Sequence, residues 1–460
     1  MTAVGRAASP RLRRLLLGGV LLALSMALVA PAAAGAVPPT YPNGWSFSAS
    51  GLRQLASTTD TRALCKGPSG SVYEVAMGTK TGYDAVMARI RVSDGHVLKR
   101  WTYPAAASAN DYIPRTAAHD SKGDLVVAME TMTGDWDWLV VKYTPAGKVV
   151  WKRHYDSGHG QDTPYGMAID HHDGVIVAGT SEAAGGYDSA IVKWSSKGKR
   201  LWTHVVGSAG LDLIGSVAVD ASDNVYVAGE LAPGGVTTYS RATVRSYRPS
   251  GHSRWTVTLS DPVSPLSFKF VVVRGKGVFV AGVAGSSTTR LLAAKYTLTG
   301  KNAWGGVKAQ AYASGAWANG LTVDRKGCAV VAAYAYAAGA SGENLAAVWK
   351  LTSAGGTAWH REFSNSAWPH DGEFNAVGTD SKCRVYAAGD VYVAGTTGNL
   401  LMVRYSAAGS EQAMWRSVGQ QSGYCAFSDV LVLTDTQVIA AGQVAGNGAD
   451  AAVYRAKTTP

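Results

Sequence analysis

One recurring pattern limits the folds that this chain can adopt. Residues 166–202, GMAIDHHDGVIVAGTSEAAGGYDSAIVKWSSKGKRLW, predict four short strands joined by tight turns, with Asp170 in the first turn and Trp202 on the last strand. Residues 120–151 and 220–255 repeat this plan. Each unit predicts one four-stranded antiparallel sheet, whose apolar faces are buried only when neighbouring units stack on it.

The pattern recurs at a period of about 50 residues. Eight β-branched runs that end in small residues, such as 175–179 and 225–229, mark the second strands. Tryptophans mark seven fourth strands: Trp101, Trp151, Trp202, Trp255, Trp304, Trp359 and Trp415. We expect these indoles to pack between neighbouring units. A period of this length with four strands per unit is typical of a propeller.

The two ends of the chain indicate how such a ring would close. After Arg455 only five residues remain, too few for another turn and strand, whereas residues 43–47 form a lone strand around Trp45. We therefore predict an all-β fold: an eight-bladed β-propeller of four-stranded antiparallel blades, closed by an N-terminal strand that completes the last blade. Closure of this kind removes exposed sheet edges.

The first 36 residues predict a signal peptide. An apolar run over 15–30 is followed by small residues up to Ala36, and four arginines precede it: Arg6, Arg11, Arg13 and Arg14. The run is shorter than the ~20 residues that span a bilayer, which argues against an uncleaved anchor. We expect a signal peptide over 1–36 and a single propeller over 37–460. The protein would be secreted, extracellular or associated with a bacterial cell wall, with no membrane span after cleavage.

The charge balance is mildly basic. Without the four arginines of the signal peptide, the formal net charge of +11 falls to +7. Because the basic residues are spread through the repeats, we predict that the protein binds no nucleic acid, and a cell-surface polyanion remains an alternative ligand. We also expect a monomer. A basic residue on each third strand, such as Lys142, Lys193 and Lys350, is expected to hold its charged head in water.

The run from Asp162 to Lys193 resembles the SBBP-type repeat of bacterial exported β-propellers, with D-x-x-x-G-M-A-I-D, then VIVAGT, then YDSAIVK. The resemblance implies the fold and an extracellular binding or structural module without shared catalytic residues. A more distant likeness is to pyrroloquinoline-quinone-type eight-bladed propellers, which share the ring and the repeated Trp. The sequence has neither their adjacent Cys pair nor a C-x-x-C-H haem motif.

A set of carboxylates is the candidate metal site. Its members stand eight or nine residues before the first-turn Asp of their units, where the innermost strands begin: Asp111, Asp162, Asp212 and Asp371. In a propeller these strand starts surround one mouth of the central channel, so the carboxylates could hold Ca²⁺ through oxygen ligands. The alternative is that each one caps its own loop. No other cofactor is predicted.

Aromatic residues in the predicted loops form the candidate ligand-binding surface. None occupies the repeated Trp position, and they are interspersed with Asp and Asn: Trp136, Trp138, Tyr165, Trp317 and Trp368. Such residues can stack on sugar rings or grip a peptide, although local loop packing is the alternative.

Four cysteines in an exported chain predict two disulfides. Three pairings are possible, and the positions within the repeat favour Cys65 with Cys425 and Cys328 with Cys383.

No nucleophile elbow, zinc-protease helix or phosphate-binding glycine loop occurs in the sequence. We therefore assign no catalytic residue and expect a secreted, non-catalytic β-propeller that acts as a binding or scaffold module for a carbohydrate or protein ligand. The alternative is an extracellular polysaccharide-active hydrolase or lyase with carboxylates at the channel mouth.

Overall fold

A computed structural model of the chain describes residues 45–49, 52–53, 64–78, 83–104, 111–132, 134–183, 186–208, 210–232, 239–286, 288–336, 344–363, 372–392, 399–416, 425–444 and 450–457. The chain divides into Met1–Gly35 and Ala36–Pro460, and every described residue belongs to the second unit. The predicted signal peptide lies outside the described residues. Within them, no helix is long and apolar enough to cross a membrane.

Seven sheets of the second unit have four antiparallel strands each. Six of these sheets follow the chain order: β7 (Tyr112–His119), β8 (Leu125–Met132), β9 (Trp136–Tyr143) and β10 (Val149–Tyr155); β11 (Thr163–Ile169), β12 (Val175–Ala183), β13 (Gly186–Trp194) and β14 (Arg200–Val206); β15 (Leu213–Val219), β16 (Val225–Leu231), β17 (Arg241–Tyr247) and β18 (Ser253–Leu259); β19 (Leu266–Arg274), β20 (Gly277–Ala284), β21 (Arg290–Thr297) and β22 (Lys308–Gln310); β23 (Ala316–Val323), β24 (Ala329–Tyr336), β25 (Asn344–Leu351) and β26 (Thr357–Phe363); β27 (Gly372–Thr379), β28 (Val385–Val391), β29 (Asn399–Tyr405) and β30 (Glu411–Arg416). The seventh joins both ends of the chain: β31 (Ala426–Thr434), β32 (Gln437–Val444), β33 (Asp450–Lys457) and β1 (Trp45–Ala49).

The fold is therefore a β-propeller with seven four-stranded blades, and the prediction of eight such blades is wrong. The additional sheet has five strands: β2 (Leu52–Arg53), β3 (Leu64–Lys66), β4 (Ser71–Gly78), β5 (Asp84–Arg91) and β6 (Val97–Tyr103). Leu52 pairs with Gly78, and Leu64 pairs with Glu74 further along the same strand. A continuous strand from Arg53 to Leu64 would need far fewer residues than 54–63 supply to stay paired with β4. The innermost position is therefore divided between β2 and β3.

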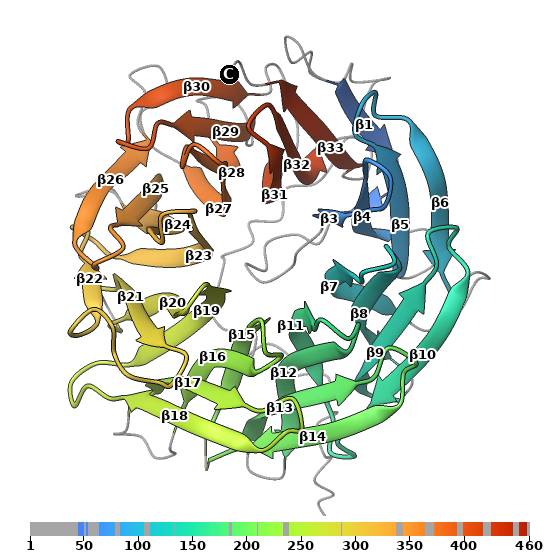
Figure 1. Cartoon of the computed structure of the whole chain (residues 1–460), viewed down its shortest axis with the longest axis horizontal. Coiled ribbons are helices and arrows are strands. Elements are labelled where there is room, and N and C mark those ends of the chain that lie inside the picture. Colours follow the sequence, from blue (N-terminus) through green and yellow to red (C-terminus); the bar gives the residue numbers. More distant parts are fainter. Residues whose placement is uncertain are drawn as a thin grey trace, which may run out of the picture. The chain divides into compact units, whose positions relative to one another are not determined.

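The sheets stand around a common centre with their innermost strands facing it (Figure 1). Neighbouring innermost strands contact one another in the order β3, β7, β11, β15, β19, β23, β27 and β31, and β31 contacts β3 again. At the closure β1 pairs with β33 from Trp45–Arg455 to Ala49–Ala451. The prediction that the Trp45 strand completes the last sheet is therefore confirmed.

Five tryptophans hydrogen-bond their blade to the next one. The indole N–H of Trp202 donates to the carbonyl of Pro249 in the next blade at 3.0 Å, and that of Trp359 donates to Ala407 at 3.1 Å. Trp151, Trp255 and Trp304 make the equivalent bond. The predicted packing between blades is thus confirmed. Trp304, however, precedes the short outer strand β22 instead of lying in it, contrary to the expectation that it marks a fourth strand.

Aspartates stabilise the first turns of five blades. The Oδ1 atom of Asp170 accepts the amide N–H groups of His172 and Gly174, as predicted for this turn. Its Oδ2 atom pairs with Lys193 Nζ at 2.7 Å, and Asp324 pairs with Lys350 at 3.0 Å. The expectation that these third-strand lysines reach water is wrong. Their heads are buried because a turn carboxylate faces them inside the blade.

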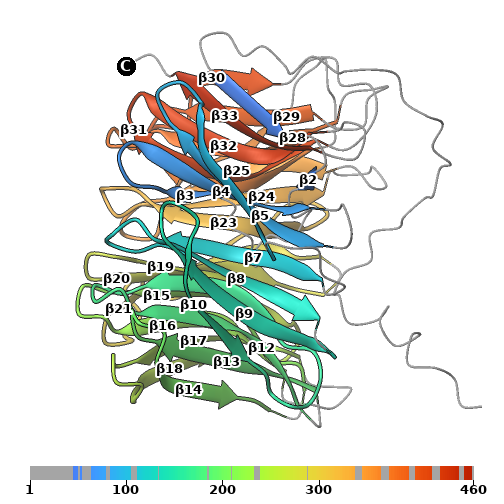
Figure 2. The ribbon, with the colours of Figure 1, turned by 90° about the vertical axis from the view of Figure 1, so that its right-hand side faces the viewer.

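The antiparallel order places two kinds of connection at opposite ends of the strands. The tight turns between first and second strands, and between third and fourth strands, lie at one end, on the left in Figure 2. We call this end the turn face. The second-to-third-strand connections and the blade-joining segments leave from the other end, which we call the loop face.

Candidate functional site

The described members of the predicted metal site, Asp111, Asp162 and Asp212, lie at different junctions between blades. Asp212 is fully buried, and its Oδ1 atom accepts the amide of Ala232 at 2.8 Å and the hydroxyl of Ser208 at 2.9 Å. Asp111 accepts the amide of Tyr83 at 3.0 Å. Asp212 thus caps a loop of its own blade, whereas Asp111 bonds a residue of the preceding blade. Metal binding by these two residues stays a prediction. Asp371 lies outside the described residues.

Asp162 lies in a group of three neighbouring carboxylates that includes neither Asp111 nor Asp212. It is fully buried, and its two oxygens accept the amides of Ser157 at 2.7 Å and Glu182 at 2.9 Å. Burial raises its pKa, although these bonds oppose the shift. One carboxylate oxygen from each of Asp137, Asp156 and Asp162 lies within 4.8 Å of the other two. The structure thus groups Asp162 with Asp137 and Asp156, and not with Asp111 and Asp212.

The predicted aromatic surface is only partly open. Trp138 is fully buried, with its ring centroid 4.7 Å from that of Tyr155, so it belongs to the core of its blade. Trp136, Tyr165 and Trp317 are half-buried. The ammonium of Lys269 lies 4.9 Å from the Trp317 ring centroid. Trp368 lies outside the described residues. Ligand binding by the half-buried aromatics stays a prediction.

None of the four cysteines forms a disulfide, so the predicted disulfides are absent from the structure. The amide of Leu64 donates to Asp429 Oδ2 at 3.0 Å, which aligns Cys65 with the middle of β31. Cys425 precedes that strand, about 13 Å away at strand spacing, and a disulfide needs Cα atoms within about 7 Å. The Lys350 ammonium lies between the turns that hold Cys328 and Cys383. It forms an ion pair with Asp324 and donates a hydrogen bond to the Cys383 carbonyl.

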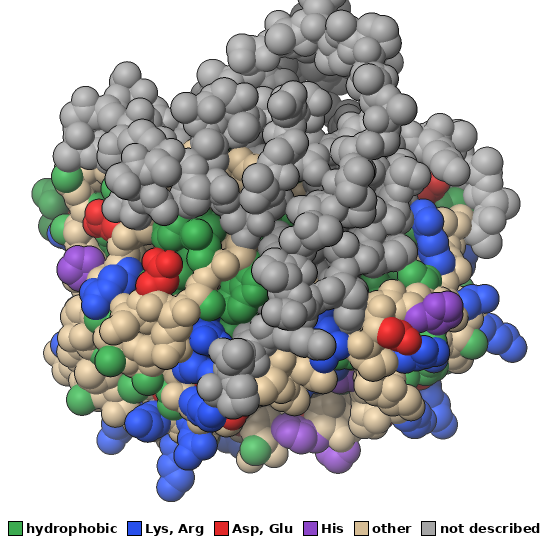
Figure 3. Space-filling view, turned by 90° about the horizontal axis from the view of Figure 1, so that it is seen from above, with side chains coloured by type: hydrophobic (Ala, Val, Ile, Leu, Met, Phe, Trp, Pro, Cys, Tyr) green, Lys and Arg blue, Asp and Glu red, His purple; other side chains and the backbone are tan. Residues whose placement is uncertain are grey.

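Basic side chains gather on the turn face. Figure 3 shows Lys and Arg along the lower side of the view, where this face lies. The exposed basic residues of the turns are Lys66, Lys122, Lys148, Lys197, Lys199, Arg248, Arg274, Lys276, Lys301, Arg325, Lys326 and Lys382. Among the described residues of these turns and of the strand ends beside them, the exposed acids are Glu411 and Asp94, and Asp94 pairs with Arg91 at 2.7 Å. The turn face is therefore positively charged.

The other acids of this face are held by hydrogen bonds between neighbouring turns. Asp173 accepts the amide and hydroxyl of Ser121 in the preceding blade, at 2.8 and 2.9 Å. These bonds outweigh burial and lower the pKa of Asp173. Asp435 receives the same pair of bonds from Ser381, at 2.8 and 2.6 Å, and its pKa is also lowered. The turns are thus fastened to one another, and the basic residues stand on a rigid base.

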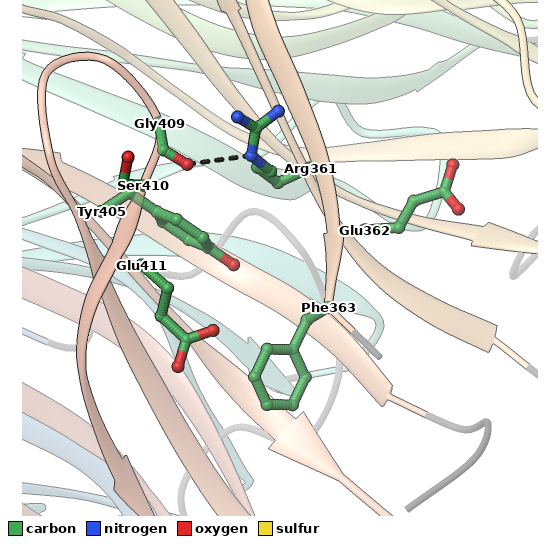
Figure 4. A pocket seen from close by; sticks show the side chains of 7 residues that line it. All are labelled: Arg361, Glu362, Phe363, Tyr405, Gly409, Ser410 and Glu411. Atoms are coloured by element: carbon green, nitrogen blue, oxygen red, sulfur yellow. Dashed lines mark hydrogen bonds between the residues drawn. The ribbon is translucent and has the colours of Figure 1, made fainter. Parts of the chain in front are cut away.

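A small pocket lies on the outer rim, between β26 and the turn that joins β29 to β30. It encloses about 180 Å³ and is lined by Arg361, Glu362, Phe363, Tyr405, Gly409, Ser410 and Glu411. Arg361 Nε donates to the Gly409 carbonyl at 2.9 Å (Figure 4). Pockets for drug-sized ligands enclose roughly 300–1,000 Å³. Its size and its place in the blade contact fit a packing gap between outer strands.

The basic face was missed at the sequence level because charge was judged along the chain. Lys122, Lys326 and Lys382 share one position, two residues after the first-turn Asp of their units. Lys148, Lys199 and Lys301 follow the glycine of the third turn. Sorting charges by position within the repeat, instead of by position in the chain, would have shown the concentration.

Comparisons with known proteins support the fold and leave the family open. No family model matches the chain. An alignment of 145 residues, which covers 26% of this chain, shows 32% identity to an uncharacterized WD repeat-containing protein, L264, of Acanthamoeba polyphaga mimivirus, and it spans a tenth of that protein's length. The predicted SBBP-type membership therefore has no support from a family model.

Solved structures similar to this one include pyrroloquinoline-quinone-type propellers. The quinohemoprotein alcohol dehydrogenase of Comamonas testosteroni matches 91% of this chain and 77% of its own, with a TM-score of 0.55 and 14% identity. A europium-containing methanol dehydrogenase matches 90% of this chain and 92% of its own, with a TM-score of 0.52 and 12% identity. At these identities the likeness shows the fold alone, and it places the chain among the β-propellers.

Proposed function

We propose that the protein is a non-catalytic binding propeller that docks an anionic polysaccharide on its turn face, at or outside the cell surface. The observation that carries this proposal is the concentration of exposed Lys and Arg on one end of the blades, where the exposed acids among the described residues are Asp94 and Glu411. Opposite charges attract over about 10 Å at 0.1 M salt, so a flexible polyanion would be held across several turns at once.

The rigidity of the turn face supports binding. Lys122, Lys326 and Lys382 donate their amides to the aspartate of their own turn. Some neighbouring turns are also joined, as by the bond from the His171 amide to Asp223 at 2.9 Å. A surface that is already ordered loses little conformational entropy when it binds. A single chain of anionic sugars would then meet charges in nearly fixed positions.

A polysaccharide fits this face better than duplex DNA does. Lysine outnumbers arginine among the exposed turn residues, and an ammonium is a point charge without the planar fork that reads bases or grips phosphate. Specific DNA readers insert a helix or a two-stranded ribbon into a groove. The described turn face consists of short turns and has neither element.

The alternative of a polysaccharide-active enzyme has less support. Glycoside hydrolysis uses two carboxyl groups about 5–10 Å apart on either side of the scissile bond. Asp162 and Asp212 are fully buried, and their oxygens accept hydrogen bonds from loop amides. These side chains hold the loops of their own junctions.

Binding of heparin, alginate, neutral dextran and duplex DNA to the whole chain tests the proposal. We expect heparin and alginate to bind, dextran not to bind, and the affinity to fall as NaCl rises. The double variant Lys197→Glu/Lys199→Glu should weaken heparin binding roughly tenfold or more. The matched control is Arg241→Glu/Arg290→Glu, which makes the same charge change on exposed residues at the loop end of the strands.

Three results would overturn the proposal. The first is an absence of salt-sensitive binding to either anionic polysaccharide. The second is equal weakening in the two double variants, which would mean that net charge acts without a defined face. The third is binding of DNA with no binding of heparin or alginate, which would assign the face to nucleic acid.

A further inference from the structure

The junction between the β7–β10 blade and the β11–β14 blade carries an unusual row of polar side chains. Tyr155 pairs with Trp138, so the next residues, Asp156 and Asp137, stand opposite each other at the loop end of β10 and β9. Asp137 in turn pairs with Thr131 on β8. Directly opposed residues of antiparallel strands point to the same side of the sheet. Thr131, Asp137 and Asp156 therefore form one row, and Asp162 reaches this row from the start of the next blade.

The carboxylates of this row are close together. One oxygen from each of Asp137, Asp156 and Asp162 lies within 4.8 Å of the others, while Asp137 is 6% exposed and Asp162 is fully buried. Within the described ranges, no Lys or Arg forms an ion pair with Asp156 or Asp162. Like charges at this spacing repel one another strongly unless a proton or a cation joins them.

Thr131 is a second, independent sign of a missing ligand. Its hydroxyl is fully buried in the row and has no hydrogen-bond partner among the described residues. A buried hydroxyl without a partner costs about 1–3 kcal/mol, so such groups are rare unless an ion or a water completes them.

The next junction along the chain is a natural comparison. There Asp188 and Asp212 take the places of Asp137 and Asp162, and Ser181 takes the place of Thr131. The Ser181 hydroxyl is satisfied by the Tyr155 hydroxyl at 2.9 Å. Gly207 stands where the first junction has Asp156, and a Cβ on Gly207 would lie 1.8 Å from Asp188 Oδ1. A side chain at this position therefore points at the carboxylate beside it, and the second junction lacks the third carboxylate.

We propose that Asp137, Asp156 and Asp162, with the Thr131 hydroxyl beside them, bind a divalent cation of the Ca²⁺ type at this junction. The donor atoms are all oxygens, which hard cations prefer, and three carboxylates supply enough charge. Asp156 is exposed, so waters can complete the six to eight ligands that Ca²⁺ takes. The ion would join two blades, because Asp137 and Asp156 belong to one and Asp162 begins the next.

The test measures Ca²⁺ binding to the whole chain by calorimetry and by thermal unfolding with Ca²⁺ or EDTA. We expect saturable binding and a rise of roughly 3 °C in Tm at a hundredfold excess over Kd. Terbium should emit on excitation of Trp and Tyr, because Trp136, Trp138 and Tyr155 are sequence neighbours of the ligands.

Asp156→Asn and Asp156→Gly are the test variants, and Asp156→Gly reproduces the Gly207 arrangement. Both should lose the calcium-dependent rise and the terbium emission, yet in EDTA Asp156→Asn should unfold no lower than the wild type, since one repelling charge is gone. Asp94→Asn, the same change at an exposed site, should keep the full response. A Ca²⁺ response that survives in both Asp156 variants, or no saturable binding in the wild type, would overturn the proposal. The basic face is not involved, so the polysaccharide assay can fail or succeed independently.

Discussion

The indole of Trp202 lies directly on Gly251 of the following blade. A Cβ built on Gly251 would stand 2.8 Å from Trp202 Cγ, and the glycine has a φ of 90°. Gly147, Gly198, Gly300, Gly355 and Gly409 meet the tryptophan of the preceding blade in the same way. The glycine of each third turn therefore serves two purposes: it permits the left-handed backbone, and it leaves room for a neighbouring indole.

Replacing Gly251 by Ala should destabilise the propeller by about 3 kcal/mol or more in urea unfolding. A left-handed conformation costs an L-residue about 1–2 kcal/mol, and displacement of the packed indole adds to this cost. Gly275→Ala is the control, because Gly275 has a φ of 58° and nothing lies within 4 Å of its added Cβ. Equal losses in the two variants would show that the indole contact contributes nothing.

Replacing Lys350 by Met should cost roughly 3–5 kcal/mol near neutral pH, because it leaves the Asp324 carboxylate buried without its partner. Although burial opposes the shift, bonds from the Cys328 amide and Lys350 lower the pKa of Asp324. A carboxyl group whose pKa is lowered by folding stabilises the protein at pH values above its unfolded-state pKa of 3.8. That stabilisation is lost as the pH falls through the pKa of the folded state. Urea unfolding should therefore show the gap to wild type narrowing below about pH 4. The exposed variant Lys301→Met should show no such pH-dependent gap.

Glu74 gives a pH dependence of the opposite sign. Burial, opposed by Arg100, raises its pKa to about 8. The neutral acid is favoured in the fold, so its contribution is complete below about pH 4.5 and is lost as pH rises through 8. The wild type should lose stability relative to Glu74→Gln between pH 5 and 8, by on the order of 4 kcal/mol in total. Urea unfolding at several pH values measures this loss, and the exposed variant Glu362→Gln should track the wild type.

The free thiols predict that a reductant will not affect stability. Because no cysteine forms a disulfide, the midpoint of thermal unfolding should be the same with and without dithiothreitol. Cys328, which is half-buried, should react with a thiol reagent before the buried Cys65, Cys383 and Cys425. A midpoint that falls on reduction would show that a disulfide forms after all.

Much of the architecture was predictable because it repeats. The first-turn Asp170 and the packing of Trp202 against the next blade follow from a pattern that recurs in most units, and the closing Trp45 strand follows from the incomplete last unit. The split between β2 and β3 was not predictable, because the extra residues 54–63 carry no periodic signal that shows where pairing stops. The prediction of eight four-stranded blades was wrong for the same reason: the split gives one sheet five strands.

The candidate sites depend on relations that a single strand does not display. The row from Thr131 to Asp156 becomes visible only when the register of three strands is known. The basic face needs all the turns brought to one end, and the cysteine pairing needed the offset between Cys65 and Cys425 along neighbouring strands. In each case the sequence shows the residue types, but only their distances in the fold determine whether they can act together.

Removal of the closing strand should weaken the ring more than its five residues suggest. A chain that begins at Gly51 lacks β1, so β33 would become an edge strand with unpaired N–H and C=O groups from Ala451 to Arg455. Open edges recruit other chains, and closure removes that opportunity. We expect a lower unfolding midpoint and self-association that grows with protein concentration in size-exclusion chromatography. A chain that begins at Val37 keeps β1 and should remain monomeric over the same range. If the shorter chain matches it in both measurements, the pairing of β1 with β33 is not what closes the ring.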